Sequence, residues 1–431
     1  MNFVSTRGNA PAVSLSAALA AGLAPDRGLY VPTELPHFEL ADFDGASSLS
    51  QVAERLLAPF FADDALQSAL HGIAARAFAI DTPCLPMAGQ GDWLLELFRG
   101  PTAAFKDYGA RFLALCLAAM RRPDDPELTI LVATSGDTGA AVAAAFHRLP
   151  GFRVAILYPD GRVSPRQAHQ LGAFGDNVRA FKVGGSFDDC QALAKRALND
   201  ATLKQCVPLS SANSISLGRL LPQMAYYAQA ALAHQRAHGR APGFIVPTGN
   251  LGNALAGVLV RAMGLPVGEI VLATNANRTL ADFFAGNDYV PRASVATLAN
   301  AMDVGAPSNF ERLQWLLPEA ASLRRALRVE WVDDATIRDT IQCAQSRHDV
   351  VPCPHTATAL CALERLRQAG DTRDFIAVAT AHPAKFDSIV EPLIGSPVTP
   401  PPALAELLTR PSQALPLAND YDALCAALGY A

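Results

Sequence analysis

A repeated pattern of short apolar strands, glycine-containing turns and helices is the feature that most constrains how this chain can fold. The expected strands occupy residues 93–98, 128–133, 154–158, 180–183, 244–247, 267–274 and 375–380. Strands that alternate with helices predict βαβ units, and therefore an α/β fold whose open, mostly parallel sheets are flanked by helices. Such sheets bind ligands at the carboxyl ends of their strands, where the N-termini of helices converge.

The composition excludes several classes of protein. Hydrophobic residues make up 50% of the 431-residue chain and charged residues 17%, which rules out a disordered chain. A net charge of −5 without any basic run argues against nucleic-acid or membrane-surface partners. No apolar stretch approaches the ~18–20 residues of a membrane span. The eight cysteines include no C-x-x-C pair, so we expect a cytoplasmic protein without a zinc framework.

Three local patterns need interpretation. Residues 12–24 resemble a signal peptide, but serines interrupt the apolar run and its leucines recur at helical spacing. We therefore expect a short packed helix capped by Ser14. His234 and His238 are four residues apart on an expected helix and could begin a metal site, yet no third ligand is near, so a solvated face is the better interpretation. A capping box at residues 308–311 is expected to start another helix.

Lysine is scarce, and one lysine stands in an unusual setting. Only five of the 35 basic residues are lysines, a bias typical of a GC-rich genome. Lys106 follows apolar residues, and Gly109, one turn later, leaves room beside it. A desolvated lysine has a lowered pKa and a nucleophilic neutral amine, as a Schiff-base lysine requires. The alternative is a lysine that extends to solvent and pairs with Asp107.

Two turns look like anion-binding sites at the starts of helices. One follows the strand at 244–247 and consists of Thr248, Gly249, Asn250, Leu251 and Gly252. Glycines let a backbone approach an anion closely, and a helix N-terminus offers free N–H groups. The other turn follows the strand at 128–133 and consists of Thr134, Ser135, Gly136, Asp137, Thr138 and Gly139. Its hydroxyls add further donors, although either segment could be an ordinary strand-to-helix turn.

Three further segments contribute to the interpretation. A Ser135 nucleophile is disfavoured, because Ala133 occupies the first glycine position of the G-x-S-x-G motif. The segment from Asn213 and Ser214 to Arg219 places a fixed cation at a helix start, where it could bind a phosphate in bidentate fashion. A Cys353 thiol nucleophile is less plausible than a proline-stiffened loop before a helix. A lysine amine, two anion sites and the polar strand end that starts at residue 380 together suit pyridoxal 5′-phosphate and an anionic substrate.

At this point the residues resemble a known family, the bacterial threonine synthases, which are fold-type-II pyridoxal-phosphate enzymes. The resemblance covers nearly the whole chain. Its motifs are residues 4–8, 28–32, 100–109, 133–139, 213–219, 247–252, 273–277, 300–304 and 379–386. It implies two open sheets flanked by helices, an N-terminal helical cap domain, and a monomer or homodimer. The implied domains are a cap at 1–92, a large cofactor domain at 93–127 and 205–399, a small α/β domain at 128–204, and a helical tail at 400–431.

The resemblance also implies roles for individual residues. Lys106 corresponds to the Schiff-base lysine and Phe105 precedes it in the signature. The turn at 248–252 corresponds to the loop around the cofactor phosphate, and Thr380 to the partner of the pyridine nitrogen. Asp137 aligns with an asparagine that usually meets the phenolic oxygen of the cofactor. The positions that grip the substrate carboxylate and phosphate correspond to Thr134, Ser135, Thr138, Asn213, Ser214 and Arg219. Ser216 and Leu217 depart from the Asn-Trp of many relatives.

The implied reaction converts O-phospho-L-homoserine and water to L-threonine and phosphate. Lys106 is then both the carrier of pyridoxal 5′-phosphate and the general base at Cα. Two alternatives stay open. One is a related phospholyase that releases 2-oxobutyrate from phosphohomoserine or phosphothreonine, and the other is a binding protein for small phosphorylated metabolites that lacks catalytic activity.

Overall fold

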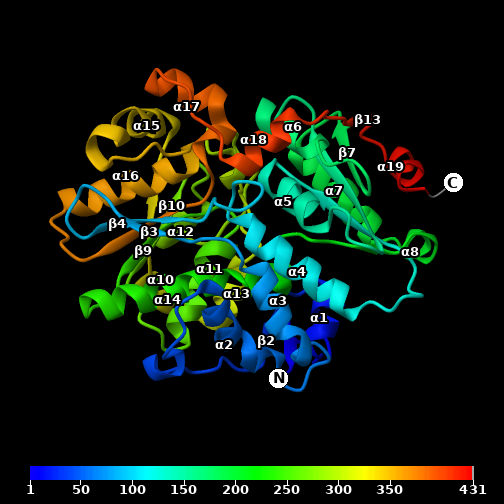
Figure 1. Cartoon of the computed structure of the whole chain (residues 1–431), viewed down its shortest axis with the longest axis horizontal. Helices are drawn as coiled ribbons and strands as arrows, with labels where there is room; N and C mark the ends of the chain where they lie inside the picture. Colours follow the sequence, from blue (N-terminus) through cyan, green and yellow to red (C-terminus); the bar gives the residue numbers. More distant parts are fainter. Residues whose placement is uncertain (430–431) are drawn as a thin grey trace.

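Two separate mostly parallel sheets form the framework of the molecule, as the alternation of strands and helices predicts. This computed structural model describes residues 1–429, so the last two residues of the expected tail lie outside the described part. The larger sheet has the strand order β11 (Leu327–Trp331), β10 (Ile270–Thr274), β9 (Gly243–Pro247), β12 (Phe375–Ala379), β4 (Asp92–Glu96) and β3 (Cys84–Pro86). The smaller has the order β13 (Leu415–Leu417), β7 (Val178–Val183), β6 (Phe152–Pro159), β5 (Leu128–Ala133) and β8 (Leu209–Ser210). Only β3 pairs antiparallel within these sheets (Figure 1).

Helices cover these sheets and also form the N-terminal part of the chain, where β1 (Phe3–Ser5) and β2 (Tyr30–Pro32) make a small hairpin-like pair. The helices of the N-terminal part are α1 (Leu15–Ala21), α2 (Leu49–Phe61) and α3 (Leu70–Ala77), with the 3₁₀ turns η1 (Leu40–Phe43) and η2 (Gln67–Ala69). The smaller sheet is accompanied by α5 (Asp137–Phe146), α6 (Pro165–Gly172), α7 (Phe187–Asn199), α8 (Ala201–Cys206), α18 (Pro402–Thr409) and α19 (Tyr421–Leu428). None of the helices within residues 1–429 is both long and apolar enough to cross a membrane.

The remaining helices belong to the larger sheet and to the junction between the sheets. They are α4 (Lys106–Met120), α9 (Leu217–Leu220), α10 (Gln223–His238), α11 (Gly252–Ala262), α12 (Thr279–Phe284), α13 (Phe310–Leu316), α14 (Ala320–Ala326), α15 (Asp334–His348), α16 (Pro354–Gln368) and α17 (Asp387–Ile394). Two 3₁₀ turns, η3 (Asn300–Met302) and η4 (Pro383–Phe386), complete the described elements.

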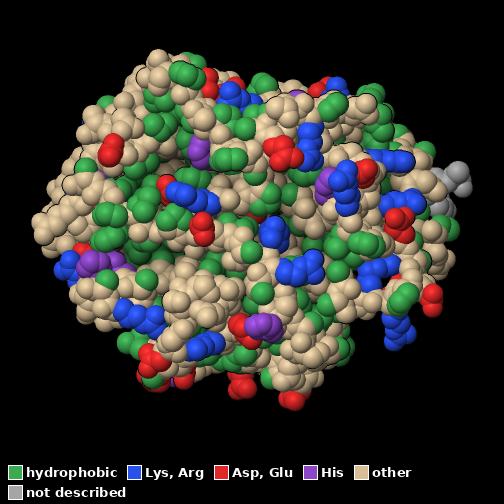
Figure 2. All heavy atoms as spheres, in the orientation of Figure 1, with side chains coloured by type: hydrophobic (Ala, Val, Ile, Leu, Met, Phe, Trp, Pro, Cys, Tyr) green, Lys and Arg blue, Asp and Glu red, His purple; other side chains and the backbone are tan. Residues whose placement is uncertain are grey.

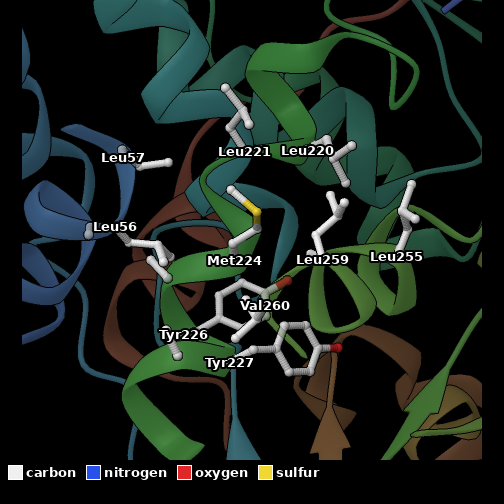
Figure 3. Packing of buried hydrophobic residues seen from close by; sticks show 14 of the residues in the cluster. Leu56, Leu57, Leu220, Leu221, Met224, Tyr226, Tyr227, Leu255, Leu259 and Val260 are labelled. Carbon is white, nitrogen blue, oxygen red and sulfur yellow. The ribbon is translucent and has the colours of Figure 1, made fainter. Parts of the chain in front are cut away.

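Alternate residues of the central strands face two different cores. In β9, Phe244 and Val246 pack with α10 and α11, whereas Ile245 faces the core formed with α16. Strands buried on both faces therefore read as continuous apolar runs. Figure 3 shows the first core, in which Leu56 and Leu57 of α2 meet Met224 of α10 and leucines of α9 and α11. The N-terminal helices thus complete the core of the larger sheet.

Short edge strands depart from the expected domain boundaries. Strand β3 precedes residue 93 but pairs with β4, and β8 follows residue 204 but pairs with β5. Strand β13 lies in the expected helical tail and pairs with β7. Strand β11, which is not among the strands expected from the sequence, alternates apolar and charged residues because it lies at a sheet edge. The edge of a sheet offers unpaired backbone groups, and the tertiary structure decides which segment pairs with them.

Two local expectations are wrong, and one is confirmed. His234 is buried, with its Nε2 2.8 Å from the Asp374 carboxylate, instead of lying on a solvated face. The expected capping box at 308–311 is absent, because Asn309 precedes α13 without a side-chain cap and Glu311 instead bonds Thr6 and Arg7. Ser14 does cap α1, accepting a hydrogen bond from the backbone of Ala17. Acidic and basic side chains are interspersed over the visible face of the molecule (Figure 2).

Candidate active site

Lys106 is the first residue of α4, where the loop before this helix meets the segment that follows β12. Its neighbours Ala104 and Ala381 form an isolated bridge, and the Phe105 N–H donates to the Thr380 carbonyl at 2.8 Å. The Lys106 side chain is only 15% exposed, and its Nζ lies 5.0 Å from the centre of the Phe105 ring. Burial lowers the pKa of Lys106, which favours the neutral amine.

Asp107 does not pair with Lys106, so the alternative interpretation of this lysine is wrong. The fully buried Asp107 carboxylate accepts hydrogen bonds from the backbone N–H of Thr102 at 2.9 Å and from its hydroxyl at 2.7 Å. Gly109 also has a different purpose from the one expected. A Cβ at this position would lie 2.9 Å from Arg219 Nε and 3.0 Å from the Arg219 carbonyl oxygen. The glycine therefore makes room for α9, not for the lysine.

Asp137, at the start of α5, is the carboxylate that faces Lys106. Its Oδ2 lies 3.6 Å from Lys106 Nζ, while its Oδ1 lies 2.9 Å from Lys385 Nζ and accepts a hydrogen bond from Gln167 at 3.0 Å. Burial acts to raise the pKa of Asp137, but the ammonium groups of Lys385 and Lys106 outweigh it, and the pKa is lowered. The site therefore contains an ionised carboxylate between two lysines.

The turn that precedes Asp137 is organised by the Thr134 hydroxyl. This oxygen accepts hydrogen bonds from the backbone N–H groups of Gly136 at 3.0 Å and Gly139 at 2.9 Å. Gly136 has a φ of 130°, a conformation that favours glycine. The half-buried Ser135 and Thr138 hydroxyls form no hydrogen bond within residues 1–429. Of the three hydroxyls predicted to grip a substrate, Thr134 is thus mainly a helix cap, and the other two are available.

The turn at 248–252 presents backbone donors without partners. Within residues 1–429, no backbone or side-chain oxygen accepts a hydrogen bond from the N–H groups of residues 249–254. Leu251 adopts a left-handed conformation with φ of 62° at the start of α11. A Cβ on Gly249 would lie 2.7 Å from Met302 Cα, so only glycine fits against this segment. A row of unpaired N–H groups at a helix start is well suited to a phosphate.

Side chains of the same turn connect it to the segment at 213–219. Asn250 donates from Nδ2 to the Ser214 hydroxyl at 2.6 Å, and its Oδ1 accepts from the backbone of Ser308. Asn250 and Ser214 therefore link the two segments directly. Asn213 is half-buried, and its side chain forms no hydrogen bond within the described chain.

Arg219 is a buried cation with an incomplete set of partners. It is 2% exposed, its Nη1 donates to the Ala212 carbonyl at 2.6 Å, and its Nε has no partner within residues 1–429. Burial lowers the pKa of Arg219 to about 10. The buried Ser216 hydroxyl likewise has no partner among the described residues. Unpaired buried donors of this kind are costly unless an anion or a water satisfies them.

Residues that sequence reasoning left out of the site also lie here. Lys385 and Gln167 contact Asp137, and His355 is buried with its Nε2 accepting from the Ala301 backbone at 3.1 Å. Burial lowers the pKa of His355 to about 4, so it is neutral near pH 7. The expected loop before a helix is confirmed, since Cys353 caps α16 and Pro354 begins it. The signal for Lys385 is its position just past the strand at 375–380, which places it near an expected anion.

The arrangement fits pyridoxal 5′-phosphate on the chemistry of its donors. The cofactor needs an amine, a phosphate site and a polar partner for its ring nitrogen. Lys106, the unpaired N–H groups of 249–254 and the Thr380 hydroxyl match these needs in type. Thr380 is buried at the carboxyl end of β12, and its hydroxyl forms no hydrogen bond within residues 1–429. Across the described residues, no group of three or more potential metal ligands is found.

Comparisons with known proteins agree with this fit. Residues 79–381 match the family described as "Pyridoxal-phosphate dependent enzyme". Residues 2–78 match "Threonine synthase N terminus", and residues 356–427 match "Threonine synthase, C-terminal". The three matches together span almost the whole chain.

Individual relatives and solved structures give the same picture. Threonine synthase of Serratia marcescens is 40% identical over 91% of each chain, and that of Escherichia coli is 39% identical over 96% of this chain and 95% of the other. The crystal structure of the Escherichia coli enzyme has a TM-score of 0.91 at 37% identity, covering 100% of this chain and 99% of the other. A structure of PLP-bound threonine synthase from Brucella melitensis has a TM-score of 0.91 at 33% identity, covering 99% and 98%.

Proposed function

Because this chain belongs to the threonine synthase family of pyridoxal-phosphate-dependent enzymes, we propose that it converts O-phospho-L-homoserine and water to L-threonine and phosphate. The observation that carries the proposal is a buried amine, Lys106, facing a buried cation, Arg219, whose Nε has no partner in the described chain, together with the unpaired Ser216 hydroxyl. The cofactor brings a phosphate and the substrate two further anionic groups, and the site offers donors for both: the row of N–H groups at 249–254 for the cofactor, and the donors around Arg219 for the substrate.

Pyridoxal 5′-phosphate, when bound, supplies an aldehyde that condenses with amines and a ring that stabilises negative charge on neighbouring carbons. Lys106 would carry this group and, once its amine is free, take the proton from Cα of the substrate. Its lowered pKa suits both tasks, because an ammonium group can neither attack a carbonyl nor accept a proton. Asp137 Oδ2, 3.6 Å away, orients the amine.

The other residues would bind the cofactor and the substrate. The backbone N–H groups of 249–254 would hold the cofactor phosphate, and the Thr380 hydroxyl would meet the ring nitrogen without protonating it. Ser135, Thr138, Asn213 and Arg219 would hold the carboxylate and phosphate of the substrate. The net reaction breaks the Cγ–O bond to phosphate and one Cβ–H bond, adds the water hydroxyl at Cβ and returns a proton to Cγ. Product phosphate is a candidate base for the water.

The test measures three products from purified protein loaded with cofactor. O-phospho-L-homoserine should yield phosphate and L-threonine in equal amounts, without 2-oxobutyrate. Phosphate with 2-oxobutyrate but no threonine would instead identify a phospholyase. If the protein neither binds pyridoxal phosphate nor turns over the substrate, the remaining hypothesis is a binding protein for small phosphorylated metabolites that lacks catalytic activity.

Domain organisation, assembly and location complete the proposal. We propose a cap at 1–92, a large domain at 93–127 and 205–399, a small domain at 128–204 and a tail at 400–431, with β3, β8 and β13 reassigned to the sheets they join. We further propose a cytoplasmic monomer or homodimer. Eight free thiols within the described chain suit a reducing compartment. Size-exclusion chromatography with light scattering measures the assembly directly.

A further inference from the structure

Lys385 is the only lysine besides Lys106 in the site as described, and it is almost completely enclosed. It lies on η4, immediately after the strand end that carries Thr380, and is 1% exposed. Its Nζ donates to the Thr102 carbonyl at 2.7 Å and lies 2.9 Å from Asp137 Oδ1. Charged lysines are almost never fully buried unless they are paired, so this position is under strong constraint.

We propose that Lys385 is a positioning residue that holds the Asp137 carboxylate through Oδ1, so that Lys106 faces the remaining oxygen of an already neutralised ion pair. The side-chain nitrogens of both lysines contact the same carboxylate, but not equally. Lys385 and Gln167 occupy Oδ1 at 2.9 and 3.0 Å, and Oδ2 is left at 3.6 Å from Lys106. The shorter contacts fix the carboxylate, and the longer one leaves the Lys106 amine free to react.

The surroundings hold Lys385 in place from three segments. Its backbone carbonyl accepts a hydrogen bond from the Ser164 hydroxyl at 2.9 Å, and the neighbouring Ala384 carbonyl accepts one from Arg166 at 2.8 Å. The Thr102 carbonyl, which receives the Lys385 ammonium, also accepts from Gln170 at 3.3 Å. The start of α6 therefore fixes the backbone of η4, while the loop before α4 and Asp137 of α5 hold the ammonium group. A side chain anchored in this way is a fixed cation, not a mobile nucleophile.

The charges around Lys106 show why such a cation matters. The ionisable groups that face Lys106 are Asp137 on α5, Lys385 on η4, Arg219 on α9 and His355 on α16. Asp137 favours the ammonium form of Lys106, whereas Lys385 and Arg219 oppose it. If Lys385 were removed, Asp137 would keep one ammonium partner only, and that partner would be Lys106. A tight Lys106–Asp137 ion pair would hold the amine in its unreactive form.

The same pair bears on the cofactor, a point that rests on the proposed function. The resemblance places Asp137 where related enzymes carry an asparagine opposite the phenolic oxygen of the cofactor. A lone carboxylate would repel an oxyanion there. An aspartate whose charge is offset by Lys385 presents, like asparagine, no net charge. Lys385 thus explains how an acidic residue is tolerated at this position.

The test uses apoprotein and titrates the Lys106 amine itself, so that it does not depend on turnover. Reductive methylation with formaldehyde is followed residue by residue by mass spectrometry across pH, in wild type and in Lys385→Met, with Lys195→Met on the exposed face of α7 as the control. We expect the midpoint for Lys106 to rise by about one to two pH units in Lys385→Met, which is roughly 10- to 100-fold slower labelling near pH 7. Lys195→Met should not change it.

Two further variants keep the result interpretable. Asp137→Asn should lower the Lys106 midpoint, and Asp137→Asn combined with Lys385→Met should reverse the rise seen in Lys385→Met alone. Should Lys385→Met fail to fold, the Asp137→Asn titration still tests the coupling. A Lys106 midpoint that stays at the wild-type value in Lys385→Met, or in Asp137→Asn, overturns the proposal. If the protein makes no threonine but these shifts occur, the proposed function fails while this inference stands.

Discussion

The two glycine-containing turns look alike in sequence but are used differently in the structure. Both follow an apolar strand of a parallel sheet and begin a helix, α5 in the smaller sheet and α11 in the larger. In the turn at 134–139, the Thr134 hydroxyl satisfies two backbone N–H groups, and the helix begins with an ionised carboxylate. In the turn at 248–252, the backbone donors from Gly249 onward have no partners within residues 1–429, and no side chain is charged.

This difference separates a turn that can bind a phosphate from a turn that sets the charge of the reactive amine. Unpaired N–H groups provide a fixed, pH-independent site for a phosphate that should stay in place throughout the reaction. A carboxylate between two lysines instead controls the charge of the amine that does the chemistry. Four substitutions test the contrast, and their expected effects decrease in the order given below.

Replacing Lys106 by alanine should have the largest effect. Because Lys106 would be both the carrier of the cofactor and the base at Cα, we expect kcat to fall by roughly 10³- to 10⁴-fold. The absorbance of the cofactor–lysine adduct should disappear from the spectrum. In wild type, borohydride reduction followed by peptide mapping should label Lys106 alone. Label on Lys385 would contradict the assignment of roles to the two lysines.

Replacing Gly249 by alanine should weaken cofactor binding. The added Cβ would meet Met302 backbone at 2.7 Å, and overpacking of this kind costs about 1–3 kcal/mol, or roughly 5- to 150-fold in Kd for pyridoxal phosphate. Gly252→Ala is the matched control, because its Cβ would have no neighbour closer than 3.4 Å. Fluorescence titration of apoprotein measures both. Equal losses in the two variants would show that backbone clearance at Gly249 is not what matters.

Replacing Thr134 by valine should reduce stability more than ligand binding. The substitution keeps the shape but removes an oxygen that accepts two backbone hydrogen bonds, and losing such a cap costs about 1–2 kcal/mol. The midpoint of thermal unfolding of the apoprotein should fall by a few degrees. A large rise in KM without any loss of stability would mean that Thr134 faces the substrate after all.

Replacing Ser135 by alanine should have the smallest effect, and unlike the Thr134 substitution it should change substrate binding instead of stability. Its half-buried hydroxyl has no partner in the described chain, so its loss should leave thermal unfolding unchanged. If it donates to the substrate, KM should rise by about 3- to 10-fold, the value of one hydrogen bond. An unchanged KM would remove Ser135 from the binding site.

Much of the framework follows from local patterns. The strand at 128–133 is found at the predicted residues, and those at 244–247 and 375–380 end within one residue of the prediction. Ser14 caps α1 as its spacing predicts. His234 was misjudged because its partner, Asp374, is remote in sequence, and a buried ion pair leaves no trace in helical periodicity.

By itself, the sequence determined the type of fold, the positions of the turns and the presence of one lysine amine among apolar neighbours. These properties depend on side-chain periodicity and on the conformational preferences of glycine, which are local. Only the tertiary structure decided that Lys385 and Gln167 meet Asp137, and that Asp107 serves Thr102 instead of Lys106. The physical reason is that charge pairing depends on distance in space. Strand order brings β12 beside β4, and with it the loops that carry both lysines to one carboxylate.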